Sequence, residues 1–351
     1  KKFLIFRITP QWFISLSKNN LRKRALDAVE KVLWFPKASK NRIQSMVEAR
    51  PDWCISRQRV WGVPIPIFLN KKTNEPLLDK KVFSRIVKTI EKEGVDSWFL
   101  KDPSHLLSPE YNPEDYEFEK NILDVWFDSG CTHSFVLEGR KDLKSPASLY
   151  LEGSDQHRGW FHSSLLESVG TRDQAPYQAV LTHGFVLDAK GRKMSKSLGN
   201  VISPQDIIEK YGADVLRLWV SLSDYTEDLR IGNETMQQLS DSYRRIRNTF
   251  RFLLGNLEGF EKKEKIEFLK MPKLEKWILH KIYEMNNYFL DCLKNYELYK
   301  FYNLLHNFCA VELSSFYFDI RKDTLYCDSI DSVKRRSCRT VLRELLNILV
   351  S

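Results

Sequence analysis

The sequence lacks the patterns of a zinc site, a disulfide framework or a membrane segment. Its six cysteines are scattered, none forms a Cys-x-x-Cys pair, and no His stands at zinc-ligand spacing from two of them. This usage is typical of reduced thiols in a cytosolic protein. No apolar run approaches the roughly 18 residues of a membrane span, and residues 1–7 lack the apolar core of a signal peptide. We therefore expect a cytoplasmic protein with no membrane partner and no zinc site in this chain.

The sequence also has fewer acidic than basic residues. The 351 residues include 55 Lys and Arg but only 46 Asp and Glu, which gives a formal net charge of +9. Such a charge favours a polyanionic partner, and it bears on association rather than on the fold. A hydrophobic content of 42% can supply the cores of two or three domains.

The two ends of the sequence have an unusual character. The chain opens on strand-like Phe3–Ile8 without an initiator Met, and it stops at Leu346–Ser351 inside an apolar helical pattern. We interpret the chain as a fragment of a longer protein.

Strand and helix signals alternate in the middle of the chain. Ser148–Gly153 is expected to form a buried strand, Trp160–Val169 a helix and Ala179–Val186 the next strand. This alternation predicts a parallel α/β sheet, whose ligands bind beyond the carboxyl ends of the strands. Glu152–His157 and the residues after Val186 lie beyond such ends.

The other segments are assigned more coarsely. Ser203 with Pro204 predicts a helix start, Gly212 its end, and Leu229–Ile231 a short strand. From about Glu234 onward helical periodicity dominates. Towards the beginning we expect an extended stretch at 1–20, helices at 21–33 and 41–48, an irregular Pro-containing stretch at 52–68 and a charge-rich inserted module at 69–120.

The most informative segment is Gly191–Asn200. It holds Lys193-Met-Ser-Lys-Ser197 between two glycines that permit unusual backbone conformations. Lysines on a loop after a strand suit a polyphosphate, because each is a point charge on a flexible stem. For a generic Lys-x-Ser-Lys run, a solvated basic turn is the commoner interpretation.

Three other segments carry polar groups that could bind a ligand. In Glu152–His157 the carboxylates could accept from ribose hydroxyls, although a polar helix-capping turn explains the segment equally well. Asp124–Gly130 could serve a site or could be a core strand ending in a turn. His183 stands at a strand end, where a lone His is more often structural, and Arg57–Arg59 more simply flanks a β-structure.

Two basic stripes occur in the helical region. Arg244, Arg247 and Arg251 recur at helical spacing, and Lys334–Arg336 forms a second run with Arg339. Most such runs are solvated helix faces. In a basic chain they are as consistent with phosphate contacts to RNA, which position a nucleic acid without reading its sequence.

Together these segments resemble the bacterial-type isoleucyl-tRNA synthetases of class I. The resemblance covers essentially the whole chain and is carried by Thr9-Pro-Gln-Trp-Phe13, Arg50-Pro-Asp-Trp-Cys-Ile-Ser-Arg-Gln-Arg59, Asp124-Val-Trp-Phe-Asp-Ser-Gly130, Leu151–Phe161, Gly191–Ser197 and Ser242–Thr249. It implies the carboxy-terminal half of a Rossmann-like parallel α/β sheet, followed by an α-helical bundle of the anticodon-binding type. It also implies ATP, Mg²⁺, isoleucine and tRNA(Ile) as ligands, and a monomer for the full-length enzyme.

The resemblance also implies roles for matched positions. Lys193 and Lys196 would be catalytic and hold the ATP phosphates, and Trp126 and Trp160 would wall the isoleucine pocket. The ATP and adenylate would be bound by Glu152, Gly153, Asp155, Gln156, His183, Ser195 and Ser197. From the two basic stripes, and not from matched motifs, we expect the tRNA to be bound by Arg244, Arg247, Arg251, Arg335 and Arg336.

One family signature is missing, because no His-x-Gly-His motif occurs in the sequence. We therefore expect this chain to hold only the half of the site that carries the lysine motif. The expected organisation is a return from an editing insertion (1–52), the second half of the catalytic domain (53–200, with the module at 69–120), a connecting module (201–236) and a partial anticodon-binding domain (237–351). The alternative is a catalytically inactive fragment that binds tRNA or a nucleotide.

Overall fold

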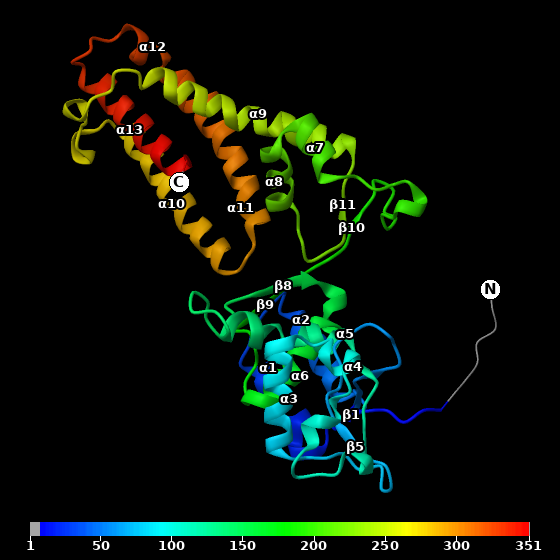
Figure 1. Ribbon diagram of the computed structural model, residues 1–351. Coiled ribbons are helices and arrows are strands. Elements are labelled where there is room, and N and C mark those ends of the chain that lie inside the picture. Colours follow the sequence, from blue (N-terminus) through cyan, green and yellow to red (C-terminus); the bar gives the residue numbers. More distant parts are fainter. Residues whose placement is uncertain (1–7, 351) are drawn as a thin grey trace. The chain divides into compact units, whose positions relative to one another are not determined.

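The computed structural model describes residues 8–350, which form two compact units that meet in the sequence between Thr182 and His183. Figure 1 shows their ribbons. The expected strand-like start at Phe3–Arg7 lies outside the described residues. Among residues 8–20, the described part of the extended stretch expected at 1–20, only β1 (Phe13–Ile14) is a strand.

The amino-terminal unit is built on a three-stranded sheet. Its strands are β2 (Leu33–Phe35), β9 (Ala179–His183) and β8 (Tyr150–Gly153), in the order β2-β9-β8. β2 and β9 run parallel, with Leu33 opposite Ala179. This confirms the parallel α/β sheet that the alternation of strands and helices predicts.

Helices pack on this sheet and enclose the core. They are α1 (Leu21–Glu30), α2 (Ala38–Glu48), α5 (Val125–Gly130) and α6 (Trp160–Arg172). α6 lies against α1 and α5, and each residue from Phe161 to Val169 is buried. α1 ends earlier than the expected 21–33 because the chain turns into β2, where Trp34 packs into the core.

One expectation for this unit is wrong. Asp124–Gly130, interpreted as a possible core strand, forms helix α5 instead. Asp124 is its N-cap, and its carboxylate accepts a hydrogen bond from the Trp126 N–H at 3.1 Å. The short apolar run Val125–Phe127 before a Gly was consistent with a strand ending in a turn, but the capping Asp starts a helix.

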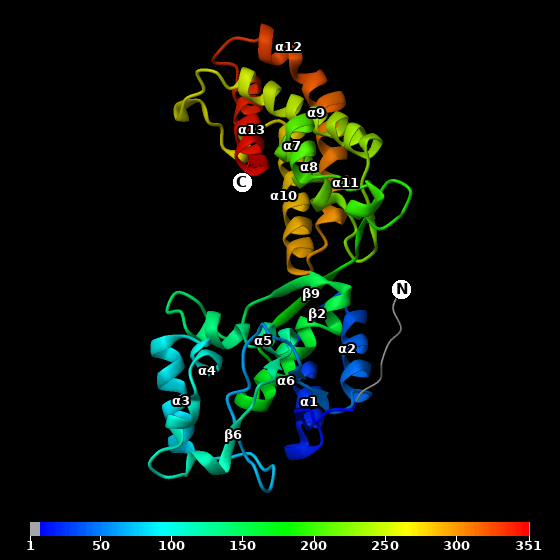
Figure 2. The same ribbon diagram turned by 45° about the vertical axis from the view of Figure 1, so that its right-hand side comes forward.

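The charge-rich segment has a core of its own around Phe68, Ile86 and Trp98. In Figure 2, α3 and α4 lie on one side of the amino-terminal unit and α1 and α2 on the other. Two short antiparallel pairs, β1 with β3 and β4 with β7, join the chain on either side of this module. The bounds are β3 (Trp53–Cys54), β4 (Ser56–Arg57), β5 (Phe68–Asn70), α3 (Lys80–Glu93), α4 (Ser97–Leu100), β6 (Tyr116–Phe118) and β7 (Ile122–Leu123).

The carboxy-terminal unit begins with a short parallel pair and continues as helices. The expected strand to Val186 is interrupted at Gly184, where a Cβ would clash with the backbone oxygen of Glu227. Ser203 caps α7 and Gly212 ends it, as predicted. The elements are β10 (Val186–Leu187), α7 (Pro204–Tyr211), α8 (Ala213–Leu222), β11 (Leu229–Arg230), α9 (Asn233–Asn256), α10 (Lys273–Lys294), α11 (Leu298–Asn307), a π-helical stretch (Phe308–Phe318), α12 (Asp319–Cys327) and α13 (Val333–Val350).

Candidate functional site

The end of β8 and the turn after it present two exposed carboxylates, Glu152 and Asp155. The chain leaves the sheet at Gly153 and makes a single 3₁₀ turn, Ser154–His157, before α6. Neither carboxylate forms an ion pair with the described residues. Carboxylates in this position can accept hydrogen bonds from hydroxyl groups of a ligand.

Gln156 and the two tryptophans meet around Gly159. The Gln156 Oε1 accepts a hydrogen bond from the Trp160 backbone N–H at 2.9 Å. A Cβ on Gly159 would lie 2.5 Å from that Oε1 and 2.8 Å from the Trp126 ring. Only glycine fits between these groups, so the structure brings together Gln156, Trp126 and Trp160.

The two tryptophans differ in how much of each ring is accessible to a ligand. Trp160 stacks on Tyr150 with ring centroids 4.0 Å apart, and its Nε1 donates to the Ser129 carbonyl at 3.0 Å. Trp126 is 42% exposed. Trp160 is thus a fixed wall with one face covered by the protein, whereas much of Trp126 is open to solvent.

The lysine loop begins after β10 and is shaped by its two glycines. Gly191 and Gly199 have φ values of 75° and 62°, the left-handed region that favours glycine. Between them, Ser195 Oγ accepts from the Leu198 N–H, and the Ser195 and Ser197 hydroxyls lie 3.1 Å apart. The Lys193 Nζ lies 5.8 Å from the Phe185 ring centre.

Asp188 anchors this loop at its base. Its Oδ1 accepts from the backbone N–H groups of Lys190 and Arg192, at 3.0 and 2.8 Å. Its Oδ2 accepts from the Arg192 Nε at 2.9 Å and the Asn200 Nδ2 at 3.0 Å. These bonds, above all that of the Asn200 amide, hold the pKa of Asp188 far below its usual range. The carboxylate is therefore charged whenever the loop is formed.

Asn200 connects the anchor to the lysines. Its Oδ1 accepts from the Ser195 N–H at 2.9 Å, and its Nδ2 also reaches the Lys193 carbonyl at 3.2 Å. Neither lysine side chain is ion-paired with another described residue. The loop is thus fixed through its backbone, while the charges of Lys193 and Lys196 remain available. Sequence reasoning missed Asp188 and Asn200 as positioning residues, although an Asp three residues before a Gly is a turn signal.

His183 ends β9 and is half-buried. Its Nδ1 lies 2.7 Å from the Gly184 carbonyl oxygen, so this nitrogen carries the hydrogen and Nε2 is left as the acceptor. The side chain can therefore accept one hydrogen bond from a ligand.

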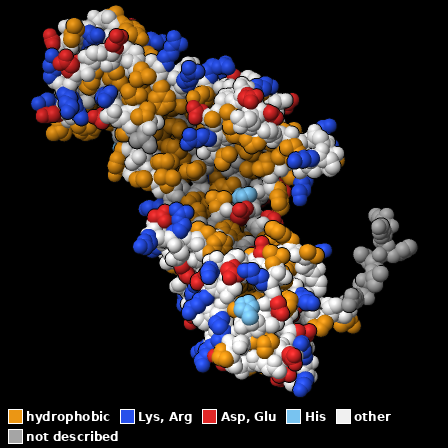
Figure 3. All heavy atoms as spheres, in the orientation of Figure 1, with side chains coloured by type: hydrophobic (Ala, Val, Ile, Leu, Met, Phe, Trp, Pro, Cys, Tyr) orange, Lys and Arg blue, Asp and Glu red, His pale blue; other side chains and the backbone are white. Residues whose placement is uncertain are grey.

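The predicted RNA-contact arginines lie on two different helices. Arg244, Arg247 and Arg251 are exposed on α9, and only Arg244 has an acidic neighbour, Asp241 at 3.4 Å. On α13, the guanidinium groups of Arg335 and Arg336 donate to backbone carbonyls of the chain. The α13 pair is thus held to the backbone of the chain, whereas Arg247 and Arg251 of the α9 stripe have no ion pair with the described residues. On the face in Figure 3, hydrophobic side chains gather over this helical unit, with Lys and Arg along its outer edge.

Comparison with known proteins supplies the family. The family model described as tRNA synthetases class I (I, L, M and V) matches residues 1–232. The chain belongs to this class I tRNA synthetase family. The model of the anticodon-binding domain of tRNA ligases matches residues 275–351.

The curated relatives agree with the resemblance that the motifs carry. The chain is 57% identical over 350 residues to the isoleucine–tRNA ligase of Pelagibacter ubique, a match that covers 99% of the chain but 39% of that protein. It is 52% identical over 343 residues to the isoleucine–tRNA ligase of Gluconobacter oxydans, with 97% of the chain and 36% of that protein covered. The chain thus spans about two fifths of the length of the curated relatives it matches.

Solved structures confirm the synthetase fold. Methionyl-tRNA synthetase of Mycobacterium tuberculosis in complex with methionyl-adenylate has a TM-score of 0.65 and 17% sequence identity to this chain. The comparison covers 96% of this chain and 58% of that one.

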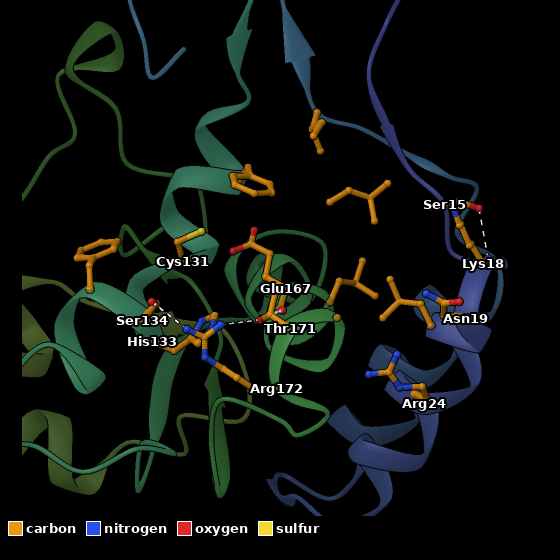
Figure 4. A pocket seen from close by; sticks show the side chains of 17 residues that line it. Ser15, Lys18, Asn19, Arg24, Cys131, His133, Ser134, Glu167, Thr171 and Arg172 are labelled. Atoms are coloured by element: carbon orange, nitrogen blue, oxygen red, sulfur yellow. Dashed lines mark hydrogen bonds between the residues drawn. The ribbon is translucent and has the colours of Figure 1, made fainter. Parts of the chain in front are cut away.

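The synthetase chain has a cavity that the sequence did not indicate. It has a volume of about 630 Å³ and lies between α1, α5 and α6 (Figure 4). The Glu167 carboxylate points into it, is 7% exposed, and has no N–H or O–H partner at either oxygen, so that the Cys131 thiol is the one donor beside it among the described residues. Arg172 lines the same cavity but is ion-paired with Glu138 at 2.5 Å. Burial raises the pKa of Glu167 to about 8, and the neighbouring Cys131 thiol offsets only part of that rise.

Within residues 8–350, no group of three or more His, Cys, Asp or Glu is placed to hold a metal ion. No helix in the same range is long and apolar enough to cross a membrane.

Replacing Glu167 with Gln should stabilise the chain in a pH-dependent way. The folded-state pKa of about 8 exceeds the ordinary value of 4.5, so the wild type loses stability as pH rises between these values. Gln cannot ionise, so we expect equal stabilities near about pH 4 and an advantage of a few kcal/mol for the variant above about pH 8. Unfolding midpoints across this range measure the difference.

Glu138→Gln is the matched control, because Glu138 is the ion-pair partner of Arg172, which lines the same cavity. The Arg172 guanidinium lowers the pKa of Glu138, so this variant should instead lose stability relative to the wild type above the ordinary carboxylate pKa. A pH-independent effect of Glu167→Gln would show that Glu167 ionises normally in the folded chain.

Proposed function

We propose that this chain is part of an isoleucine–tRNA ligase. Such an enzyme joins isoleucine to ATP as isoleucyl-adenylate and then transfers isoleucine to tRNA(Ile). Two relatives with 57% and 52% identity carry that name. The observation that carries the proposal is the intact lysine loop, whose backbone is fixed by Asp188 and Asn200 while both lysines stay unpaired.

The first step needs charge stabilisation more than covalent help. An isoleucine carboxylate oxygen attacks the α-phosphorus of ATP, the bond to the bridging oxygen of the β-phosphate breaks, and pyrophosphate leaves. We assign Lys193 and Lys196 to the phosphates, where they stabilise the charge that develops on pyrophosphate. The hydroxyls of Ser195 and Ser197 can donate to the same oxygens.

The turn after β8 would hold the nucleoside part. We assign the Glu152 and Asp155 carboxylates to ribose hydroxyls, Gly153 to close backbone approach, and Gln156 to the adenylate. His183 Nε2 would accept from the nucleotide. Trp126 and Trp160, which meet at Gly159, would wall the isoleucine side chain.

In the second step a terminal hydroxyl of the tRNA attacks the carbonyl carbon of the adenylate, and AMP leaves. We assign Arg244, Arg247 and Arg251 to tRNA phosphates, with Arg335 and Arg336 as weaker candidates because each guanidinium already donates to a backbone carbonyl of the chain. Mg²⁺ would arrive with the ATP phosphates. A cytoplasmic location and a monomeric enzyme stay predictions.

The expected domain organisation also stays a proposal. Residues 1–52 would return from an editing insertion, 53–200 would complete the catalytic domain, 201–236 would connect it, and 237–351 would bind the anticodon region. The second candidate function is a catalytically inactive fragment that binds tRNA or a nucleotide. It is favoured by the absence of a His-x-Gly-His motif in the 351 residues.

Isoleucine-dependent exchange of pyrophosphate into ATP separates the two candidates. We expect the purified chain alone to show no exchange at a useful rate, because the sequence holds one of the two family signatures. Exchange should appear when the same residues are part of a polypeptide that also carries the other signature. Turnover by the chain alone on the order of 1–10³ per second would show that the missing motif is dispensable.

Lys196→Ala, made in the active ligase, should lower the rate of isoleucine activation by about 10²–10³-fold. The lysine contributes mainly in the transition state, so the Michaelis constant for isoleucine should change little. Lys190→Ala is the matched control, because it removes an exposed charge six residues away and leaves the loop lysines in place. Equal effects of the two variants would indicate that only net charge matters, and a change confined to the isoleucine Michaelis constant would contradict the assignment.

RNA binding by the chain should fall steeply with salt. Each phosphate neutralised by the α9 stripe releases counterions, so the log–log slope reports the number of contacts. Replacing the three α9 arginines with Ala should weaken binding and flatten the slope. The matched control removes three lysines from α10, namely Lys276, Lys281 and Lys294. A triple α9 variant that binds like this control would show that the stripe is only a solvated face.

A further inference from the structure

A second positive region lies on the amino-terminal unit, away from the lysine loop in the sequence. It is a cleft of about 650 Å³ between α2, the turn after this helix and the start of α6. Arg42, Arg50, Arg158 and His162 line it, together with small and apolar residues. The whole cleft belongs to one compact unit, so its charge does not depend on the lysine loop.

No described ion pair neutralises the arginines of this cleft. None of the three arginines forms an ion pair or a side-chain hydrogen bond with residues 8–350. Arg50 is placed 5.2 Å over the Trp53 ring, and its Nε is buried without a partner. Burial and the charge of Arg158 lower the pKa of Arg50, and Asp124 opposes them. Asp124 itself is engaged by Arg57 at 2.5 Å.

His162 adds a buried polar group aimed at the same space. It is 1% exposed, and neither of its ring nitrogens makes a hydrogen bond of good geometry. Burial, followed by the charge of Arg50, lowers its pKa to about 3, so the ring is neutral at physiological pH. Leaving such a group unpartnered in the interior is unfavourable, whereas an anion in the cleft could accept its N–H.

We propose that this cleft binds a phosphate group carried by RNA or by a nucleotide. Guanidinium groups match phosphate oxygens with two parallel hydrogen bonds, and a neutral imidazole supplies one more donor. Arg42 and Arg158 are exposed and can meet a phosphate from solvent, while Arg50 and His162 line the inner part.

The surroundings favour a ligand larger than a free ion. A neighbouring cleft of about 300 Å³ shares Arg50, Pro51 and Arg158 and continues to Trp126 and Gly159. A phosphate on the shared arginines could therefore belong to a ligand that extends from one cleft into the other.

Titration of the histidine-labelled chain with inorganic phosphate tests the site by NMR. The chain has seven histidines, and we expect the His162 ring signals to move and saturate while sodium chloride at equal ionic strength leaves them in place. Arg42→Gln and Arg158→Gln should each weaken phosphate binding about tenfold. Both positions are exposed, so an unchanged unfolding midpoint is expected and should be verified.

The matched control is Arg140→Gln, an exposed arginine of the same unit that is paired with Asp142. No movement of His162 up to about 20 mM phosphate, an equal response to chloride, or equal losses in the control would overturn the proposal. Competition shows which molecule carries the phosphate that the cleft binds. If a short single-stranded RNA displaces inorganic phosphate at a lower concentration than AMP does, the ligand is RNA. If AMP displaces it at the lower concentration, the ligand is a nucleotide. None of these measurements requires aminoacylation, so they stand whatever the exchange assay gives.

Discussion

The burial of α6 on every side is the constraint on which the amino-terminal unit depends. A helix that is enclosed all round must place each of its polar side chains in the interior. Ser164 satisfies this by donating to the Gly130 carbonyl at 3.0 Å and approaching the Tyr150 hydroxyl at 3.1 Å. His162 and Glu167 find no such partner. Five residues at about 100° each set them on different sides of the helix, and each faces a different cavity.

The same helix also fixes the geometry of the predicted amino-acid pocket. Trp160 is its first residue, and the stack on Tyr150 ties it to β8 of the sheet. The preceding Gly159 lets Gln156 and Trp126 approach the helix start more closely than any side chain would permit. The packing of α6 in the core therefore also determines how the polar groups at the turn after β8 are arranged.

In the lysine loop, unlike in α6, the buried charged group has hydrogen-bond partners, and the exposed lysine side chains have none among the described residues. Asp188 is held by four hydrogen bonds from Lys190, Arg192 and Asn200, so the one buried carboxylate at its base is fully satisfied. The lysines beyond it are left without acidic partners. A rigid backbone with free cationic side chains is preorganised for a polyanion, because little has to rearrange when charge develops.

Much of this arrangement could be predicted from the sequence, and the reasons for the failures are physical. The parallel sheet, α6, and the limits of α7 at Ser203 and Gly212 are dictated by local pattern and capping. α5 was mistaken for a possible strand, since a six-residue helix is too short for its periodicity to be distinguished from alternation. His162 and Glu167 could be expected to be buried, but the sequence cannot reveal that their neighbours offer no partner. The roles assigned to the lysines and tryptophans stay predictions.

The unneutralised cations have a consequence for stability. Burial and the nearby charge of Arg158 disfavour the charged form of Arg50, and the opposing charge of Asp124 does not fully compensate them. Anything that binds the folded chain at this cleft, and not the unfolded chain, raises its stability by an amount that grows with ligand concentration. The arginines and the imidazole therefore couple the stability of the unit that holds α6 to the presence of an anion. If acidic side chains were permanently paired with these arginines, the free chain would be more stable. The cleft would then have no affinity for phosphate.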